Sequence, residues 1–162
     1  MRDVELRRLF LNDGVRLRAL FLRENNLQDT GMNESHDKIT SKVVRTWLKE
    51  RIRMYARKKP SFVVYAVLDE RKKLIGTVGV GNINYKTKSA EIGCWISEKR
   101  AGLGYGTLAV RSFLKEFLNL LHLKKVVAEV AKENIASLRI LEKNRFTLKK
   151  KIKNYLFLER VF

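Results

Sequence analysis

The feature that most constrains this chain is a glycine-rich stretch at residues 100–106, Arg-Ala-Gly-Leu-Gly-Tyr-Gly. A strand pattern precedes it over residues 90–97, and a helix pattern with one apolar stripe follows over 106–121. Glycines at such a junction let the backbone turn tightly and bring bare N–H groups against a ligand. The start of the helix adds unpaired N–H groups and the positive end of its dipole, which favour phosphate. The stretch therefore indicates either a phosphate-binding loop or a plain turn, and its flanks must decide.

The remainder of the chain has the pattern of alternating strands and helices, without repeats or linkers. Strands are expected over residues 4–11, 62–68, 74–84, 90–97 and 125–130, with a last extended stretch over 146–162. Helices are expected over 12–23, where Asn12 is the capping residue, and over 40–55, 106–121 and 134–143. Antiparallel strands followed by strand–helix alternation predict an α+β fold, and 162 residues fit a single domain.

Three motifs carry a family resemblance. Ala90-Glu-Ile-Gly-Cys-Trp-Ile96 comes first, the glycine-rich stretch second, and Asn134-Ile-Ala-Ser-Leu-Arg-Ile-Leu-Glu-Lys-Asn-Arg-Phe146 third. In this order and at these spacings they resemble the GNAT acetyltransferases, most closely the branch that acetylates the N-termini of ribosomal proteins. The resemblance runs from Val4 to the C-terminus. It implies the GNAT fold, a mixed and mostly antiparallel twisted sheet with helices on both faces and splayed central strands.

The resemblance also implies acetyl-CoA as co-substrate, and no metal. The pantetheine arm would lie in the splay against the main chain of Trp95, Ile96 and Ser97. The pyrophosphate would rest on the N–H groups of the loop and the first helical turn, namely those of Gly102, Leu103, Gly104, Tyr105, Gly106 and Thr107. The family usually has Gln or Arg where this chain has Ala101. Arg100 is the candidate for that positive charge, and Lys99 is a second one.

Amine acetylation requires a base, because an amine must lose its proton before its lone pair attacks the thioester. Glu91 and Glu129 lie on the two strands that would flank the splay, and either can take the proton directly or through water; the alternative is two solvent-facing carboxylates. The departing thiolate needs a proton, and the resemblance assigns this role to Ser137. The matching Asn134 would bind the pantetheine region, although Asn134 and Ser137 also fit a plain helix start. Other branches have a tyrosine at the position of Leu141.

The net charge of +18 bears on the acceptor and on partners. It indicates either a solvated basic surface or a partner of opposite charge, such as a ribosomal RNA surface or an acidic protein. A polycationic acceptor such as spermidine would be repelled. The resemblance implies that the preferred acceptor is a protein N-terminal α-amino group, bound beside the first two helices and their loop, near residues 33–36. The alternatives are a small-molecule acetyltransferase for a polyamine or an antibiotic, and a non-catalytic CoA- or RNA-binding module.

The cysteine and histidine content points away from disulfides and metals. The single cysteine, Cys94, cannot form an internal disulfide and is expected to be a small core residue. His36 and His122 lack metal-ligand spacing. No apolar run reaches the roughly 20 residues of a membrane helix, and the N-terminus lacks the pattern of a secretory signal. We therefore expect a cytoplasmic protein.

The C-terminal residues 155–162 have the pattern of an apolar strand. The family pairs this strand with a following one that the sequence does not contain. An isolated apolar edge promotes association. We therefore expect the segment to pair across a homodimer or to be disordered.

Overall fold

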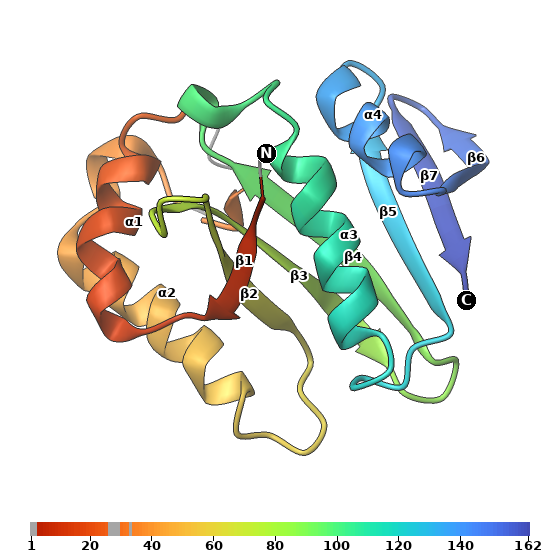
Figure 1. The fold of residues 1–162 in the computed structure, drawn as a ribbon, viewed down its shortest axis with the longest axis horizontal. Helices are drawn as coiled ribbons and strands as arrows, with labels where there is room; N and C mark the ends of the chain where they lie inside the picture. The colour runs from red at the N-terminus through yellow and green to blue at the C-terminus, as the bar shows by residue number, and fades with distance from the viewer. Residues whose placement is uncertain (1–2, 26–29, 33) are drawn as a thin grey trace.

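The computed structural model describes residues 3–25, 30–32 and 34–162. Within them, seven strands form one sheet in the order β1-β2-β3-β4-β5-β7-β6 (Figure 1). Neighbouring strands are antiparallel except β4 and β5, which are parallel. The strands are β1 (Glu5–Arg8), β2 (Val63–Leu68), β3 (Leu74–Asn84), β4 (Ser89–Ile96), β5 (Lys125–Ala131), β6 (Thr147–Ile152) and β7 (Tyr155–Val161). This is the mixed, mostly antiparallel sheet that the sequence predicts.

Helices cover both faces of this sheet (Figure 1). One face packs against α3 and α4, and the other against α1 and α2. The helices are α1 (Gly14–Phe21), α2 (Ser41–Met54), α3 (Tyr105–Phe117) and α4 (Ile135–Lys143), with short 3₁₀ turns at Leu11–Asp13, His36–Lys38 and Glu98–Arg100. The α2 helix begins at a side-chain cap, since the Thr40 hydroxyl accepts a hydrogen bond from the Val43 N–H at 3.2 Å. The predicted helices are confirmed, with ends displaced by a few residues.

Two apolar clusters, one on each face, hold these layers together. The α3 face is filled by aliphatic side chains from five strands and by Val110, Phe113 and Leu114 of the helix. On the opposite face the Phe21 ring lies 5.6 Å from Trp47 and 5.3 Å from Trp95, measured between ring centroids. These three rings join α1, α2 and the end of β4. Truncating a buried ring such as Phe21 to alanine costs about 3–5 kcal/mol, so this cluster stabilises the packing of both helices against the end of β4.

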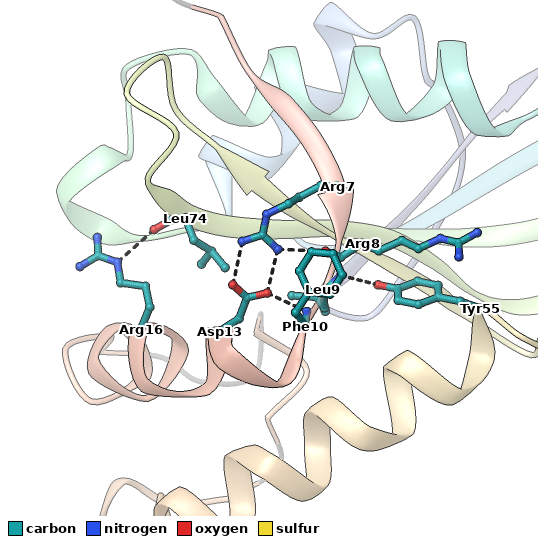
Figure 2. A network of polar contacts seen from close by, with 8 residues as sticks. All are labelled: Arg7, Arg8, Leu9, Phe10, Asp13, Arg16, Tyr55 and Leu74. Carbon is teal, nitrogen blue, oxygen red and sulfur yellow. Dashed lines mark hydrogen bonds and ion pairs between the residues drawn. The ribbon is translucent and has the colours of Figure 1, made fainter.

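A polar network ties β1 to the start of α1 and the end of α2 (Figure 2). The Arg7 guanidinium donates to both carboxylate oxygens of Asp13, at 2.7 and 2.8 Å. Asp13 also accepts from the Phe10 N–H at 2.8 Å, and this corrects the expectation that Asn12 caps the helix. Asn12 lies inside the 3₁₀ turn Leu11–Asp13. The Asp13 carboxylate, at the end of this turn, accepts from the main chain at its start. The Tyr55 hydroxyl accepts from the Leu9 N–H at 2.9 Å, which fastens α2 to the same strand.

The C-terminal segment differs from the prediction. Residues 146–162 form not one strand but two, β6 and β7, joined by a turn at Lys153–Asn154. β7 lies between β5 and β6 and pairs with both, so the expected unpaired edge at 155–162 is wrong. The argument for a homodimer or for disorder at that strand therefore fails. The edge strand on this side of the sheet is β6, whose residues are all exposed and include three consecutive lysines, Lys149–Lys151, a composition that discourages edge-to-edge pairing.

Candidate active site

The site is built around the place where the two parallel strands separate. β4 and β5 pair only over residues 89–91 and 125–127. Beyond that, β4 stays with β3 as far as Ile96, while β5 stays with β7 as far as Ala131. The separation opens a cleft of about 610 Å³ that is lined by both strands and by α4. The splayed central strands are thus confirmed.

The splay leaves part of the β4 main chain without a strand partner. The Trp95 carbonyl faces β3, where a Cβ placed on Gly76 would lie only 2.1 Å from its oxygen. The Ser97 N–H also bonds to β3, at 2.8 Å from the Ile75 carbonyl oxygen. Because main-chain groups alternate sides along a strand, those of Ile96 and Cys94 face the splay. Of the three residues expected to present main-chain groups there, Trp95 and Ser97 use theirs within the sheet, and Ile96 remains.

The glycine-rich loop has the geometry that its sequence predicts. Gly102 and Gly104 have φ angles of +71° and +92°, and no atom lies within 4 Å of the place where either Cβ would be. The first helical hydrogen bond of α3 runs from the Leu108 N–H to the Gly104 carbonyl at 3.1 Å. The N–H groups of the first turn, at residues 105–107, therefore have no intrahelical partner. Gly106 serves packing, since a Cβ there would lie 2.6 Å from Ile140 of α4.

The turn between β2 and β3 anchors this loop through two side chains. The Arg100 guanidinium donates to Asp69 at 2.8 Å, and the Tyr105 hydroxyl donates to Glu70 at 2.8 Å. The Asp69 side chain is fully buried and also accepts from two N–H groups of its own turn. Arg100, expected to supply charge to a pyrophosphate, is thus bound to a carboxylate. Lys99, the second candidate, is exposed.

Two cations that the sequence analysis did not select line the hollow beside the loop. This hollow, of about 320 Å³, is bounded by the loop on one side and by α4 on the other. Arg139 and Lys143 of α4 line it together with Gly102, Gly104 and Thr107. Their i, i+4 spacing places them on one face of the helix. Arg100 also lines this hollow, although its guanidinium is paired with Asp69, so the unpredicted cations of α4 face the same space as the predicted one.

The three predicted catalytic residues line the same cleft. Glu91 of β4, Glu129 of β5 and Ser137 of α4 all border the 610 Å³ space. Glu91 is level with Val127, so it shares a sheet face with Glu129, two residues further along β5. The Glu91 carboxylate accepts a hydrogen bond from the Asn82 amide at 2.9 Å. Both carboxylates therefore reach the splay from one face of the sheet.

Asn134 and Ser137 join the cleft to the hollow beside the loop, since both residues line both spaces. The Asn134 side-chain oxygen accepts from the Ser137 N–H at 3.1 Å, which is the helix cap expected as the simpler interpretation. The Ser137 hydroxyl takes no part in this cap. Within the described part of the chain it makes no hydrogen bond that would occupy it. Leu141, at the position where other branches of the family have a tyrosine, is buried in the core. It supplies no polar group to the cleft.

Cys94 lies on β4 beside the splay and packs against the α3 cluster. Burial raises the pKa of its thiol to about 12, so the thiolate is scarce at neutral pH. The side chain is half-buried and borders the cleft, so the expectation of a core residue is met only in part. Among the described residues, no three His, Cys, Asp or Glu side chains are grouped to hold a metal ion. No helix within those ranges is long and apolar enough to cross a membrane.

A second pocket, of about 310 Å³, lies beside the cleft and shares Gly93 and Cys94 with it. Trp47 and Arg51 of α2 line it, facing β2, β3 and β4. We call it the α2 pocket. Of the predicted acceptor contacts at 33–36, Asn33 lies outside the described residues. The His36 Nε2 lies 2.6 Å from the Glu24 main-chain oxygen, so that side chain is directed at the backbone after α1.

An opened parallel strand pair that leads to a glycine loop and a helix N-terminus defines the class of acyltransferases with the GNAT fold. The sequence matches the family model described as acetyltransferase (GNAT) domain over residues 4–147. The chain therefore belongs to the GNAT acetyltransferase family and is an acyltransferase. A search of curated protein sequences gives no significant match.

Solved structures with the same fold include enzymes for different amines. Ribosomal-protein-S5-alanine acetyltransferase from Vibrio fischeri has a TM-score of 0.84 at 19% identity, over 98% of this chain and 92% of that one. RimL, a ribosomal L7/L12 alpha-N-protein acetyltransferase in complex with coenzyme A, has a TM-score of 0.83 at 18% identity, over 98% and 94%. A chimera of spermidine N-acetyltransferase SpeG from Vibrio cholerae with hSSAT has a TM-score of 0.76 at 21% identity, over 98% and 95%. At these identities the similarity establishes the fold and leaves the acceptor open.

Proposed function

We propose that this chain is an acetyl-CoA-dependent N-acetyltransferase whose acceptor is a protein N-terminal α-amino group. The observation that carries the proposal is the continuity of the site. The splay between β4 and β5 meets the glycine loop at Asn134 and Ser137, which line both spaces. A cofactor with a phosphate end and a thioester end fits this layout, because one end needs N–H donors and the other needs catalytic side chains.

In this proposal the cofactor lies along the splay. Its pantetheine amides pair with the main chain of Ile96 and Cys94, the groups that β4 turns away from β3. Its pyrophosphate rests on the N–H groups of residues 102–107, where two positive-φ glycines leave open space. Arg139 and Lys143 lie across the hollow and balance the remaining phosphate charge.

The chemistry assigned to the cleft balances as one acyl transfer. The acceptor nitrogen forms a bond to the acetyl carbon, and the carbon–sulfur bond breaks. The proton leaves the amine for Glu91 or Glu129, directly or through one water. A main-chain N–H of β4 in the splay stabilises the oxyanion. The thiolate takes a proton from the Ser137 hydroxyl, and the protonated carboxyl group returns one to Ser137 through water, so the net transfer is one proton from the amine to the thiol; the Ser137 main-chain N–H alone serves the helix cap.

The preference for an α-amino group rests on charge and on similarity. The net charge of +18 opposes the approach of a polycation. RimL and the S5 alanine acetyltransferase, which share the fold, act on protein N-termini by name. A small-molecule amine is the second candidate, supported by the similarity to spermidine N-acetyltransferase. The lysines of β6 and the overall charge also support docking to a ribosomal RNA surface.

The test is a thiol-release assay after calorimetry has measured acetyl-CoA binding. Peptides with free N-termini, the same peptides with blocked N-termini, and spermidine serve as acceptors. Turnover restricted to free N-termini supports the proposal. Turnover of spermidine alone supports the second candidate, and binding without any turnover indicates a non-catalytic module. Salt-sensitive RNA binding that acetyl-CoA leaves unchanged would point instead to an RNA-associated protein.

The two carboxylates can be separated in the same assay. Glu91→Gln and Glu129→Gln each remove one proton acceptor at nearly constant shape. The variant that lacks the base loses about 10²–10⁴-fold in kcat, while its acetyl-CoA affinity stays at the wild-type level. If neither substitution lowers kcat, the base is not one of these residues.

A further inference from the structure

The α2 pocket contains a cation that the proposed chemistry does not use. Of the described residues that line this pocket, Arg51 alone carries a charge. The others are mostly glycines, aliphatic side chains and rings. Only 14% of the Arg51 side chain is exposed. Proteins rarely bury a guanidinium group without an anionic partner. The Arg51 guanidinium is such a case, and it lies in a pocket beside the cleft.

The protein itself satisfies this guanidinium poorly. Its terminal nitrogens donate to the main-chain oxygens of Trp47 at 3.2 Å and Gly31 at 3.4 Å. Its Nε is buried and has no hydrogen-bond partner among the described residues. Among the described residues, its one ion-pair partner is the Glu50 carboxylate, 3.7 Å away on a side chain that is 61% exposed, so it compensates the charge weakly. Burial lowers the pKa of Arg51 to about 10, which is the direction expected for a desolvated cation that lacks a close anion.

The guanidinium is nevertheless held in place. Its Cζ lies 3.6 Å from the centroid of the Trp47 ring, a stacked arrangement, and 5.6 Å from that of Phe62. Trp47 in turn donates from its indole N–H to the Gly31 carbonyl at 3.0 Å and packs edge-on against Phe21. Stacking orients the planar fork without using its donors, so the fork remains suited to a carboxylate.

The width of the α2 pocket, from the β4 side that it shares with the cleft to its β2 side, sets the length of the ligand. Gly93 of β4, Gly79 of β3 and Val64 of β2 lie in one row across the sheet, and all three line the pocket. Two strand spacings of about 4.8 Å make this row about 10 Å long. An extended peptide covers that length with about three residues at roughly 3.3 Å each. A peptide amine at the Gly93 end therefore places its second or third residue near α2.

We infer that the α2 pocket recognises a carboxylate of the acceptor through Arg51, so that the substrates are N-termini with an acidic side chain at the second or third residue. This rests on the proposed function, which it narrows. The glycine-rich lining admits a small first residue. A polyamine would place its distal ammonium groups against the Arg51 guanidinium and would find no carboxylate among the described residues of the pocket.

The experiment compares peptides that differ by a single charge. One pair has glutamate or glutamine at the second residue, and another has the same exchange at the third; spermidine is included. We expect the wild-type protein to favour glutamate in one pair by about 10-fold or more in kcat/KM, the size of a charge-assisted hydrogen bond. Arg51→Gln removes the preference. Arg53→Gln, the same exchange at an exposed position of the same helix, retains it.

The outcomes separate the inference from the proposed function. Equal rates for glutamate and glutamine peptides in the wild-type protein overturn the inference and leave the proposed function standing. A preference that survives in Arg51→Gln, or that falls equally in Arg53→Gln, reflects the overall charge and also overturns it. Acetyl-CoA binding without turnover of any peptide overturns both. The wild-type ratio decides even where Arg51→Gln fails to fold, and thermal unfolding of that variant shows whether it did.

Discussion

The two halves of the candidate site present different kinds of chemical group, main-chain groups in one half and side chains in the other. The half proposed to bind the cofactor, from the end of β4 through the glycine loop to α3, presents main-chain groups at positive-φ glycines and at an unpaired strand edge. The half proposed to bind the acceptor, between α2 and strands β2 to β4, presents side chains such as Trp47 and Arg51. A main-chain site needs glycine and a fixed spacing, so it leaves a signature in the sequence. A side-chain site depends on which residues the fold brings together, so it changes without altering any motif.

The largest effect is expected where a side chain is forced into the main-chain half. Gly104→Val adds a branched side chain at a φ of +92°, in the space proposed for the pyrophosphate. We expect the Kd for acetyl-CoA to rise by about 100-fold or more, since backbone strain of about 1–3 kcal/mol adds to the lost contacts. Calorimetry measures the affinity, and circular dichroism verifies the fold.

A matched control separates this effect from the loss of any glycine. Gly14→Ala changes a helical residue with a φ of −57°, whose added Cβ would make an ordinary 3.4 Å contact. Its acetyl-CoA affinity should equal that of the wild-type protein. Wild-type affinity in Gly104→Val as well would remove the loop from the cofactor site.

The next prediction concerns a side chain that acts within the main-chain half. Ser137→Ala deletes the hydroxyl but keeps the N–H that Asn134 caps, so helix α4 should remain intact. We expect kcat to fall about 10-fold or more with little change in KM, because the lost interaction is made with the developing thiolate. Steady-state kinetics with a peptide acceptor measures both constants.

Asn134→Ala is the informative counterpart. It removes the cap and should cost about 1 kcal/mol in the free energy of unfolding, which thermal or urea unfolding can measure. Should Ser137→Ala lose stability as Asn134→Ala does, with kcat unchanged, the hydroxyl would have a structural role only.

The sequence predicted the fold because periodicity and turn residues agree along most of the chain. It missed the β6–β7 turn, where Lys153 adopts a φ of 50°, a left-handed conformation that glycine or asparagine usually signals. The bond from Arg100 to Asp69 spans 31 residues, and no local pattern reveals such a pair. Arg51 follows Trp47 by one helical turn, but it looks like another cation on the polar face of α2 until the sheet is placed beside it.

A smaller effect is expected from the cations of α4. Arg139→Ala combined with Lys143→Ala removes two charges from the hollow opposite the loop. We expect the Kd for acetyl-CoA to rise about 10-fold at low salt and less at high salt, because both side chains are exposed and salt screens exposed charges. Arg111→Ala combined with Lys115→Ala, at exposed positions on α3, removes the same two charges away from the hollow and controls for the overall charge. Equal affinities for the α4 double variant and this control would assign phosphate binding to the main chain alone.

The smallest effect is expected at the boundary between the two halves, where Glu24 lies. Only 5% of this residue is exposed, and its carboxylate accepts from the Trp95 indole N–H and from the Glu98 N–H, both at 3.2 Å. Burial raises the pKa of Glu24 above its ordinary 4.5, although these two bonds act in the opposite direction. The folded state therefore binds this proton more tightly than the unfolded state does. The stability that this protonation contributes is complete below the unfolded pKa and is lost as the pH rises through the folded one.

Glu24→Gln should remove the loss of stability that ionisation of the Glu24 carboxyl group causes as the pH rises. The free energy of unfolding of the variant, relative to wild type, should therefore increase as the pH rises from about 4.5 toward neutrality, the window set by the raised pKa. Urea unfolding at a series of pH values measures the difference, and Glu116→Gln, at an exposed position on α3, shows the effect of removing a carboxylate alone. If the free energy of unfolding depends on pH in the same way for Glu24→Gln and for wild type, the Glu24 carboxyl group ionises as readily in the folded protein as in the unfolded one. In that case the two halves meet at an ordinary hydrogen-bonded contact, and the acetyl-CoA affinity of the variant should follow that of wild type at every pH.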